Sequence, residues 1–190
     1  MPGAQPRDVA CDGSARGAAR ICAGTGAQSA GNVGDMYSTR VSQRVNAPRS
    51  VVYQALVNAD AIAKWRVPAG MSSHVHEFDA REGGSFRISL TYDVPGPTGK
   101  SSSHTDTYHG HFAELVPDER VVEVFEFETA EPEMRGTMTM TTTLTDADGG
   151  TEVVIVHEGI PDAIPAADNE TGSRMALANL AALVEGERAP

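Results

Sequence analysis

The sequence predicts an α+β fold in which an antiparallel sheet of about seven strands is covered by a long C-terminal helix. The first observation is the strict alternation of apolar and polar residues from Phe86 to Tyr92, which is typical of a strand with one buried face. The second is the order of the predicted elements over residues 37–187: a strand, short helices, a run of strands and a long helix. The third is an apolar stripe on that last helix, which a one-sided sheet needs as its cover.

The first strand and the two short helices are predicted from a change in hydrophobic period. Residues 39–47 are expected to form the strand. Pro48 suits the first helical position, where the missing N–H of proline costs nothing, and the first helix continues over residues 49–57. Asp60 is expected to cap the second helix, which carries Trp65, the only tryptophan of the chain.

Further strands are predicted between clusters of turn residues. They cover residues 72–79, 84–93, 106–116, 120–128, 136–145 and 151–158. Gly83 and Gly84 are expected to supply the positive φ values of the tight turn before the second of these strands. Residues 94–103 are expected to form a long flexible loop. Around Met138 and Met140 every second residue is threonine, which indicates one buried and one wet face.

The last helix is predicted to begin at residues 168–171 and to end at Gly186. Its apolar stripe consists of Met175, Leu177, Leu180, Leu183 and Val184. We expect this stripe to cover the apolar face of the sheet.

Residues 1–36 differ in composition from the rest of the chain. They are rich in glycine and alanine and have almost no large aliphatic side chains, so burial cannot offset the entropy lost on ordering. We therefore expect residues 1–36 to be disordered and residues 37–187 to form one domain. The only cysteines, Cys11 and Cys22, lie in the first segment, which predicts a domain without a disulfide framework.

The net charge of the chain is −11, and residues 37–187 carry the acidic excess, because the Arg and Asp residues of the first 35 positions cancel. An acidic surface repels phosphate groups, so nucleic-acid binding and membrane-surface binding are disfavoured. The sequence contains neither an apolar run as long as a membrane span nor the apolar core of a secretory signal. We therefore expect a cytoplasmic protein, either a monomer or a homodimer.

A set of segments, taken in order, resembles one protein family. They are residues 45–56, 64–65, 78–87, 114–121, 148–153 and 175–184. Residues 78–87, Phe-Asp-Ala-Arg-Glu-Gly-Gly-Ser-Phe-Arg, look like the signature hairpin of that family. The chain resembles the activators of heat-shock-protein-90 ATPase, within the START/birch-pollen-allergen (SRPBCC) superfamily. The resemblance covers residues 37–187 and is specific to the fold, not to an activity.

The resemblance implies a helix-grip fold, in which a curved antiparallel sheet wraps around the long C-terminal helix and leaves a cavity between them. It implies binding of a small hydrophobic molecule in that cavity as the leading function. The alternatives are a stress-related module that interacts with a chaperone, and an enzyme of the cyclase, dehydratase or hydrolase type that uses an acid in the cavity.

Two features depart from the family pattern. Eukaryotic activators carry an additional N-terminal chaperone-binding domain, which the glycine- and alanine-rich residues 1–36 cannot be. Many relatives have a tryptophan near the start of the last helix, where this chain has Ser173. The smaller side chain is expected to enlarge or open the mouth of the cavity.

The residues expected to line the cavity occupy the inward phase of the strands and helices. They are Trp65, Phe86, Ile88, Tyr92, Tyr108, Phe112, Glu123, Phe125, Met138, Met140, His157 and Leu180. Most are first of all core residues, and the methionines suit an adaptable lining. Tyr92 and Tyr108 are natural polar contacts for a ligand. No cofactor, metal or catalytic residue is predicted.

Two ionisable residues share the inward phase, and each has two interpretations. Glu123 is in phase with Phe125, and His157 is in phase with Ile155. Inside an apolar cavity the pKa of Glu123 would be raised and the residue would mark a functional site, whereas at the rim of the sheet it would be hydrated. The same alternatives hold for His157.

Other polar patterns give weaker indications. Two histidines lie on one face of a strand in each of the pairs His74/His76 and His109/His111, as a zinc site requires. For the second pair, apolar residues occupy the opposite phase and are expected to face inward. We therefore expect His109 and His111 to be exposed to solvent. Residues 104–108 predict either a capped edge strand or a site that gates a ligand. The hydrolase pattern Gly-x-Ser-x-Gly and a phosphate-binding glycine loop are missing.

Overall fold

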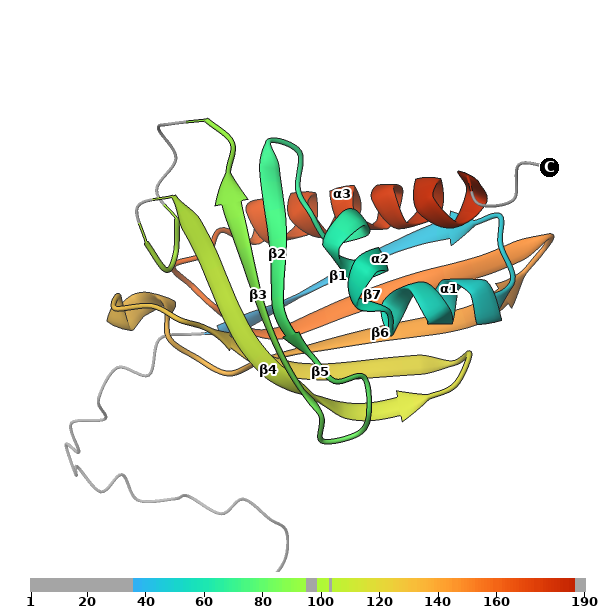
Figure 1. Cartoon of the computed structure of the whole chain (residues 1–190), viewed down its shortest axis with the longest axis horizontal. Coiled ribbons are helices and arrows are strands. Elements are labelled where there is room, and N and C mark those ends of the chain that lie inside the picture. The colour runs from blue at the N-terminus through green and yellow to red at the C-terminus, as the bar shows by residue number, and fades with distance from the viewer. Residues whose placement is uncertain (1–35, 95–98, 103, 187–190) are drawn as a thin grey trace, which may run out of the picture. The chain divides into compact units, whose positions relative to one another are not determined.

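The computed structural model describes residues 36–94, 99–102 and 104–186, all within the unit Gly34–Pro190. The described residues form one seven-stranded sheet, three α-helices and a short 3-10 helix (Figure 1). The segment predicted to be disordered lies outside the described residues apart from Met36, which begins the first strand. Half of the predicted loop over residues 94–103 also lies outside them.

The predicted elements are present in the predicted order, each to within a few residues. The first part of the described chain contains β1 (Met36–Val45), α1 (Arg49–Leu56), α2 (Ala59–Trp65), β2 (Met71–Phe78) and β3 (Ser85–Tyr92). The second part contains β4 (Thr105–Val116), β5 (Arg120–Phe127), the 3-10 helix η1 (Pro132–Met134), β6 (Met138–Ala147), β7 (Gly150–Pro161) and α3 (Ala166–Gly186). Only η1 has no counterpart in the prediction.

The strands lie in the order β1-β7-β6-β5-β4-β3-β2, and every pairing is antiparallel. Strands β2 to β7 therefore form a meander, and β1 joins its far edge beside β7. The sheet is strongly curved, and α3 runs along its concave side, where α1 and α2 also lie (Figure 1). The predicted α+β helix-grip fold is confirmed.

The core fills the space between the concave face of the sheet and the helices. Alternate strand residues point into it: Phe86 and Ile88 of β3 are each 1% exposed, and Met138 and Met140 of β6 are buried while Thr139 between them is partly exposed. This is the pattern expected of strands with one wet face.

Helix α3 contributes its C-terminal half to the core. Its buried residues are Leu177, Leu180, Ala181 and Val184. The predicted stripe was wrong at Met175, which is 40% exposed: it lies five positions before Leu180, about 140° around the helix, and borders the cavity rather than the packed core. No helix in the described part of the chain, the 21 residues of α3 included, combines the length and apolarity needed to cross a membrane.

Two local predictions need correction. Asn58, not Asp60, caps α2: its side-chain oxygen accepts a hydrogen bond from the N–H of Ala61 at 3.0 Å, because the helix begins two residues earlier than predicted. In the turn before β3 only Gly83 has a positive φ, of 75°. Gly84 is needed for a different reason, since a Cβ there would lie 2.1 Å from the carbonyl oxygen of Asp79.

Candidate functional site

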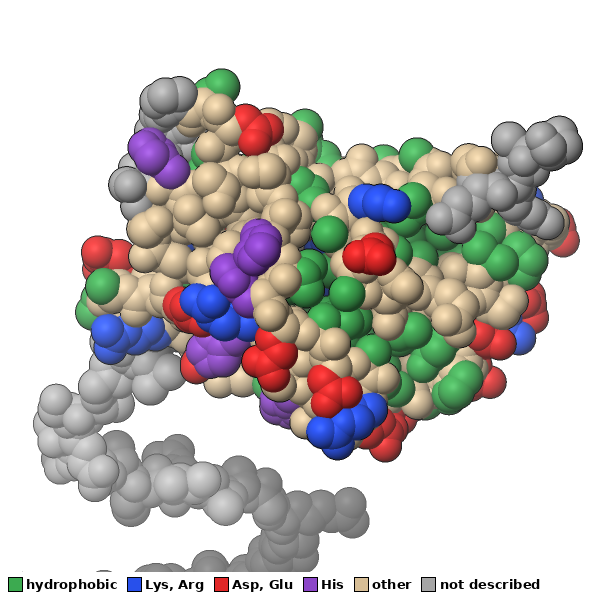
Figure 2. Space-filling model, viewed as in Figure 1, with side chains coloured by type: hydrophobic (Ala, Val, Ile, Leu, Met, Phe, Trp, Pro, Cys, Tyr) green, Lys and Arg blue, Asp and Glu red, His purple; other side chains and the backbone are tan. Residues whose placement is uncertain are grey.

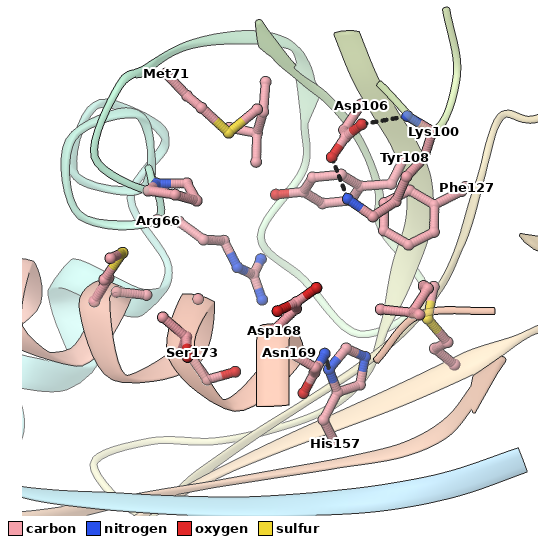
Figure 3. A pocket seen from close by; sticks show the side chains of 18 of the residues that line it. Arg66, Met71, Lys100, Asp106, Tyr108, Phe127, His157, Asp168, Asn169 and Ser173 are labelled. Atoms are coloured by element: carbon pink, nitrogen blue, oxygen red, sulfur yellow. Dashed lines mark hydrogen bonds and ion pairs between the residues drawn. The ribbon is translucent and has the colours of Figure 1, made fainter. Parts of the chain in front are cut away.

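A cavity of about 580 Å³ lies between the concave face of the sheet and the N-terminal half of α3. Side chains from β2 to β7, the end of α2, η1 and the start of α3 form its wall (Figure 3). The C-terminal half of α3 packs directly on the core, whereas the N-terminal half borders this space.

Most of the wall is apolar and comes from alternate strand positions. The apolar lining residues of the strands and η1 are Met71, Leu90, Tyr92, Phe125, Phe127, Met134, Met138, Met140 and Ile155. Four of these are methionines, whose unbranched side chains adapt to irregular shapes. Such a lining suits a small apolar molecule better than a rigid polar one.

Arg66 lines the cavity and forms an ion pair with Glu123, which lies behind it. The Nη1 and Nη2 groups of Arg66 donate hydrogen bonds to the two carboxylate oxygens of Glu123, at 2.8 and 2.5 Å. The side chains are only 12% and 5% exposed. Burial alone would lower the pKa of Arg66, but the carboxylate of Glu123 and the hydroxyl of Tyr108 outweigh it and raise that pKa. The guanidinium therefore stays charged.

Tyr108 lies beside this pair, on β4. Burial raises the pKa of its phenol, against the opposing effect of the Arg66 charge. The hydroxyl is therefore neutral, and it contacts the guanidinium of Arg66 as a hydrogen-bond acceptor. A buried group of this kind presents a fixed dipole at the wall of the cavity.

His157 of β7 lies on the same wall, and the residue is only 8% exposed. The side chain of Asn169 donates a hydrogen bond from Nδ2 to His157 Nδ1 at 2.9 Å, and the hydroxyl of Thr39 donates to Asn169 Oδ1 at 2.6 Å. Burial and the nearby charge of Arg66 lower the pKa of His157 to about 4, although the contact with Asn169 acts in the opposite direction. The imidazole is neutral at physiological pH, and its Nε2 has no hydrogen-bond partner.

A second ion pair lies toward the open end of the cavity. The ammonium group of Lys100 pairs with the carboxylate of Asp106, a residue of β4 (Figure 3). The same ammonium group lies 5.3 Å from the ring centre of Phe127. These contacts attach the described part of the β3–β4 connection to the strand that follows it.

The structure separates the predicted lining residues into two groups. The cavity wall contains Trp65, Tyr92, Tyr108, Phe125, Met138, Met140 and His157. The other apolar residues, which are packed in the core away from the cavity, are Phe86, Ile88, Phe112 and Leu180. Glu123 has its predicted inward orientation but is 4% exposed and faces Arg66, so its hydrated alternative is wrong.

The paired histidines lie on the outside of the sheet, whereas Asp106 and Tyr108 of the pattern at residues 104–108 are buried and line the cavity. His74, His76, His109 and His111 are exposed, and Figure 2 shows histidine side chains among charged ones over this region. Within the described residues no His, Cys, Asp or Glu cluster could hold a metal ion. Residues 104–108 do not begin an edge strand, since β4 lies between β3 and β5.

The polar residues of the wall that were not among the predicted lining residues include Arg66 and Asn169. Arg66 follows α2 as its C-cap residue, outside any strand or helix period, so no alternation pattern places it. The inward phase of Glu123 could have indicated that such a partner exists, because a buried carboxylate requires a cation or several hydrogen-bond donors. No sequence pattern predicted the role of Asn169. Its partner His157 belongs to β7, and the two side chains meet only when α3 packs against the sheet.

Comparison with a family model places the chain among known proteins. The model described as "Activator of Hsp90 ATPase homolog 1-like protein" matches residues 46–185, which is most of the chain. The resemblance predicted from the sequence is confirmed. No curated protein matches the chain.

Solved structures of similar fold come from several bacteria. A protein of Chromobacterium violaceum is 35% identical, with a TM-score of 0.69, over 78% of this chain and 96% of that chain. A protein of Rhodobacter sphaeroides is 19% identical, with a TM-score of 0.65, over 81% of this chain and 100% of that chain. An AHSA1-like protein of Aeromonas hydrophila is 18% identical, with a TM-score of 0.59, over 80% and 94% of the two chains. The last two show similarity of fold alone.

Proposed function

The chain belongs to the activator of Hsp90 ATPase homolog 1-like family, and on that basis we propose that its domain binds a small, mainly hydrophobic molecule between the sheet and α3. The observation that carries this proposal is a cavity of about 580 Å³ with a mainly apolar wall. Protein interiors are normally close-packed, and voids larger than a water molecule are few. A space of this size lies within the range typical of small-molecule sites.

The distribution of charge supports a ligand with few polar groups. Arg66 is paired with Glu123, and Lys100 is paired with Asp106, so neither cation of the wall lacks a counter-ion. Placing an anionic ligand against such a wall would desolvate its charge without a compensating partner. An apolar body instead gains about 25 cal/mol for each Å² of apolar surface removed from water.

The alternative functions have no comparable support among the described residues. An acid catalyst needs a carboxyl group that can reach a substrate, but both oxygens of Glu123 accept hydrogen bonds from Arg66. Interaction with a chaperone stays a prediction based on the family.

Binding of a neutral fluorescent probe, N-phenyl-1-naphthylamine, tests the proposal. We expect probe fluorescence to rise on binding and the melting temperature to increase, because a ligand at about 100 times its Kd adds about 2.7 kcal/mol to the free energy of unfolding. Native mass spectrometry of the purified protein would detect a molecule that it retains.

Gly172 offers a matched pair of variants for this test. It borders the cavity on α3, and a Cβ at this position would have no atom within 4 Å. Gly172→Leu should fill part of the space and weaken probe binding at least tenfold. Gly172→Ala should improve the helix without filling the space and keep the affinity. Equal affinity of both variants, or no probe binding by the wild type, would contradict the proposal.

A further inference from the structure

We propose that the cavity selects neutral apolar molecules that carry a carbonyl oxygen, and that His157 donates the hydrogen bond from Nε2–H that recognises this oxygen. The inference rests on the proposed function and adds the chemical class of the ligand. It is carried by the position of His157, its hydrogen-bonded neighbours and the pairing of the charges around it.

A chain of hydrogen bonds sets which ring nitrogen carries the proton. In the structure the Thr39 hydroxyl donates to Asn169 Oδ1, and the Nδ2 group of the same amide donates to His157 Nδ1. A neutral imidazole that accepts at Nδ1 has its single N–H at Nε2. The three residues come from β1, α3 and β7, so this chain of hydrogen bonds forms only in the closed fold, and we infer the Nε2–H tautomer from it.

The Nε2–H group of His157 has no acceptor. In the described part of the chain only two buried side-chain nitrogen or oxygen atoms lack a hydrogen-bond partner, Ser73 Oγ and His157 Nε2. Of these two residues only His157 belongs to the cavity wall. Figure 3 shows its ring beside Asn169. A buried donor without an acceptor costs free energy. A ligand that supplies the acceptor removes this cost, and its binding becomes more favourable by that amount.

The surrounding charges favour a neutral acceptor over an anion. The groups that face this part of the cavity are Arg66 after α2, Tyr108 on β4 and Asp168 on α3 (Figure 3). Glu123 neutralises Arg66, Tyr108 is uncharged, and the carboxylate of Asp168 opposes a second negative charge. A ketone or ester carbonyl accepts one hydrogen bond without needing a counter-ion, whereas a carboxylate would need one.

The ligand oxygen can reach Nε2 when one flexible side chain moves. Nε2 is buried, and the cross-strand neighbour of His157 is Met140 of β6. Directly opposite residues on one face of a sheet are in contact, and methionine has three rotatable bonds with which to rearrange. Met140 is therefore the side chain expected to rearrange when a ligand binds.

Matched probes test the inference. We would measure the Kd of 2-acetylnaphthalene, of its near-isostere 2-isopropenylnaphthalene, which lacks the oxygen, and of the anion 2-naphthoate, each by displacement of N-phenyl-1-naphthylamine. The wild type should bind the ketone about 5- to 100-fold more tightly than the hydrocarbon, as expected when an unsatisfied buried donor gains its acceptor. The anion should bind no more tightly than the ketone.

Two variants separate recognition by His157 from a general effect. His157→Phe keeps a ring of similar size without a donor, so the preference for the ketone should disappear while the hydrocarbon still binds. His111→Phe makes the same change on the exposed face of β4 and should keep the preference. Equal binding of ketone and hydrocarbon by the wild type, tighter binding of the anion, or a preference that survives in His157→Phe would overturn the inference. Failure of every probe to bind would overturn the proposed function as well.

A ligand-independent measurement guards against misfolding of the variant. Nitrogen-15 NMR of the wild-type imidazole reports which ring nitrogen is protonated. We expect the Nε2–H tautomer of His157 at pH 7. The Nδ1–H tautomer would leave Nε2 as an acceptor and would overturn the assignment of a carbonyl ligand.

Discussion

Arg66 and Glu123 illustrate how one residue determines the state of another inside this domain. Glu123 occupies an inward position of β5 between apolar neighbours, where an unpaired carboxylate would be costly. Arg66 leaves the end of α2 and covers both oxygens of that carboxylate. Bidentate geometry makes such a pair strong, but desolvation of both groups offsets much of the gain. Replacing one partner should therefore lower the free energy of unfolding more than replacing both.

A double-mutant cycle on this pair gives the first prediction. Arg66→Met and Glu123→Leu alone should each lower the free energy of unfolding by about 3–5 kcal/mol, because each leaves a buried charge without its partner. The double variant should be less destabilised than either single variant. Urea denaturation at pH 7 measures all four proteins.

Arg87 and Glu128 provide the control for that cycle. They form a bidentate pair at 2.7 and 2.9 Å, but their side chains are 40% and 34% exposed. Their single variants should change stability by less than about 1 kcal/mol. Similar costs for the two pairs would show that burial is not what makes the Arg66–Glu123 pair important.

The second residue-scale prediction concerns pH. His157 has a pKa of about 4 in the folded protein, below its ordinary value of 6.5. Between these values the unfolded chain binds more protons than the folded one, so folding stability is complete above pH 6.5 and falls as the pH drops toward 4. The loss attributable to His157 should reach roughly 3 kcal/mol. Thermal unfolding followed at pH 7, 6, 5 and 4.5 measures it.

Carboxylates contribute at lower pH and can be distinguished. Hydrogen bonds from Arg87 and Arg120 lower the pKa values of Glu128 and Glu114 below 4.5, so their contributions are lost only below pH 4.5. In His157→Phe, the free energy of unfolding should therefore change less with pH between pH 6.5 and 4.5. The steeper loss of stability below pH 4.5 should remain. An unchanged slope in the upper window would refute the buried, neutral state of His157.

At the scale of elements, the position of α3 decides whether the cavity exists. The amide Nδ2 of Asn179 donates to the carbonyl oxygens of Trp65 and Val67, at 3.3 and 2.8 Å. These carbonyls follow the end of α2, where helical partners are lacking. One side chain of α3 thus fixes the helix to the segment that carries Arg66, and connects the two sides of the cavity wall.

Replacement of Asn179 should loosen that connection. Asn179→Leu leaves two carbonyl groups without their donor and should lower the free energy of unfolding by about 1–3 kcal/mol. Amide hydrogen exchange should accelerate in α2 and the N-terminal half of α3 more than in β5 and β6. Ala178→Leu, at the neighbouring exposed position, controls for the added leucine. Uniform acceleration through the whole domain would contradict a local role.

Elements were predictable from sequence because their periods are local. Alternation in β3 and β6 reports one buried face directly, and the order of elements then limits the sheet to a meander covered by the last helix. Two local predictions failed. The cap of α2 is Asn58 and not Asp60, because the exact start of a helix depends on backbone geometry that hydrophobic period does not report. Met175 is not buried with the other apolar residues of α3, because its angular position on the helix differs from theirs.

At the scale of the whole molecule, the cavity depends on contacts that no local pattern contains. Phe112 and Phe125 both point inward, yet only Phe125 reaches the cavity; Phe112 pairs with Glu123, two residues further along the sheet than the Gly110–Phe125 pair. Residue phase could therefore predict which side chains are buried, but not which of them border the space beneath α3. The partners of Glu123 and His157 come from other elements and likewise become visible only in the closed fold.

The mouth of this cavity gives the last prediction. Ser173 lies in the wall on α3. Ser173→Trp should narrow the space, since an indole ring occupies volume that a ligand would otherwise fill. The affinity for N-phenyl-1-naphthylamine should fall more than tenfold, while a smaller probe such as indole should lose much less. Ser173→Ala should keep both affinities, because it changes polarity without adding bulk.

If Ser173→Trp bound both probes as the wild type does, the apolar ligand would have to enter and bind elsewhere on the domain. A size-dependent loss would instead tie ligand choice in this family to the residue that faces the cavity from the first turns of the last helix.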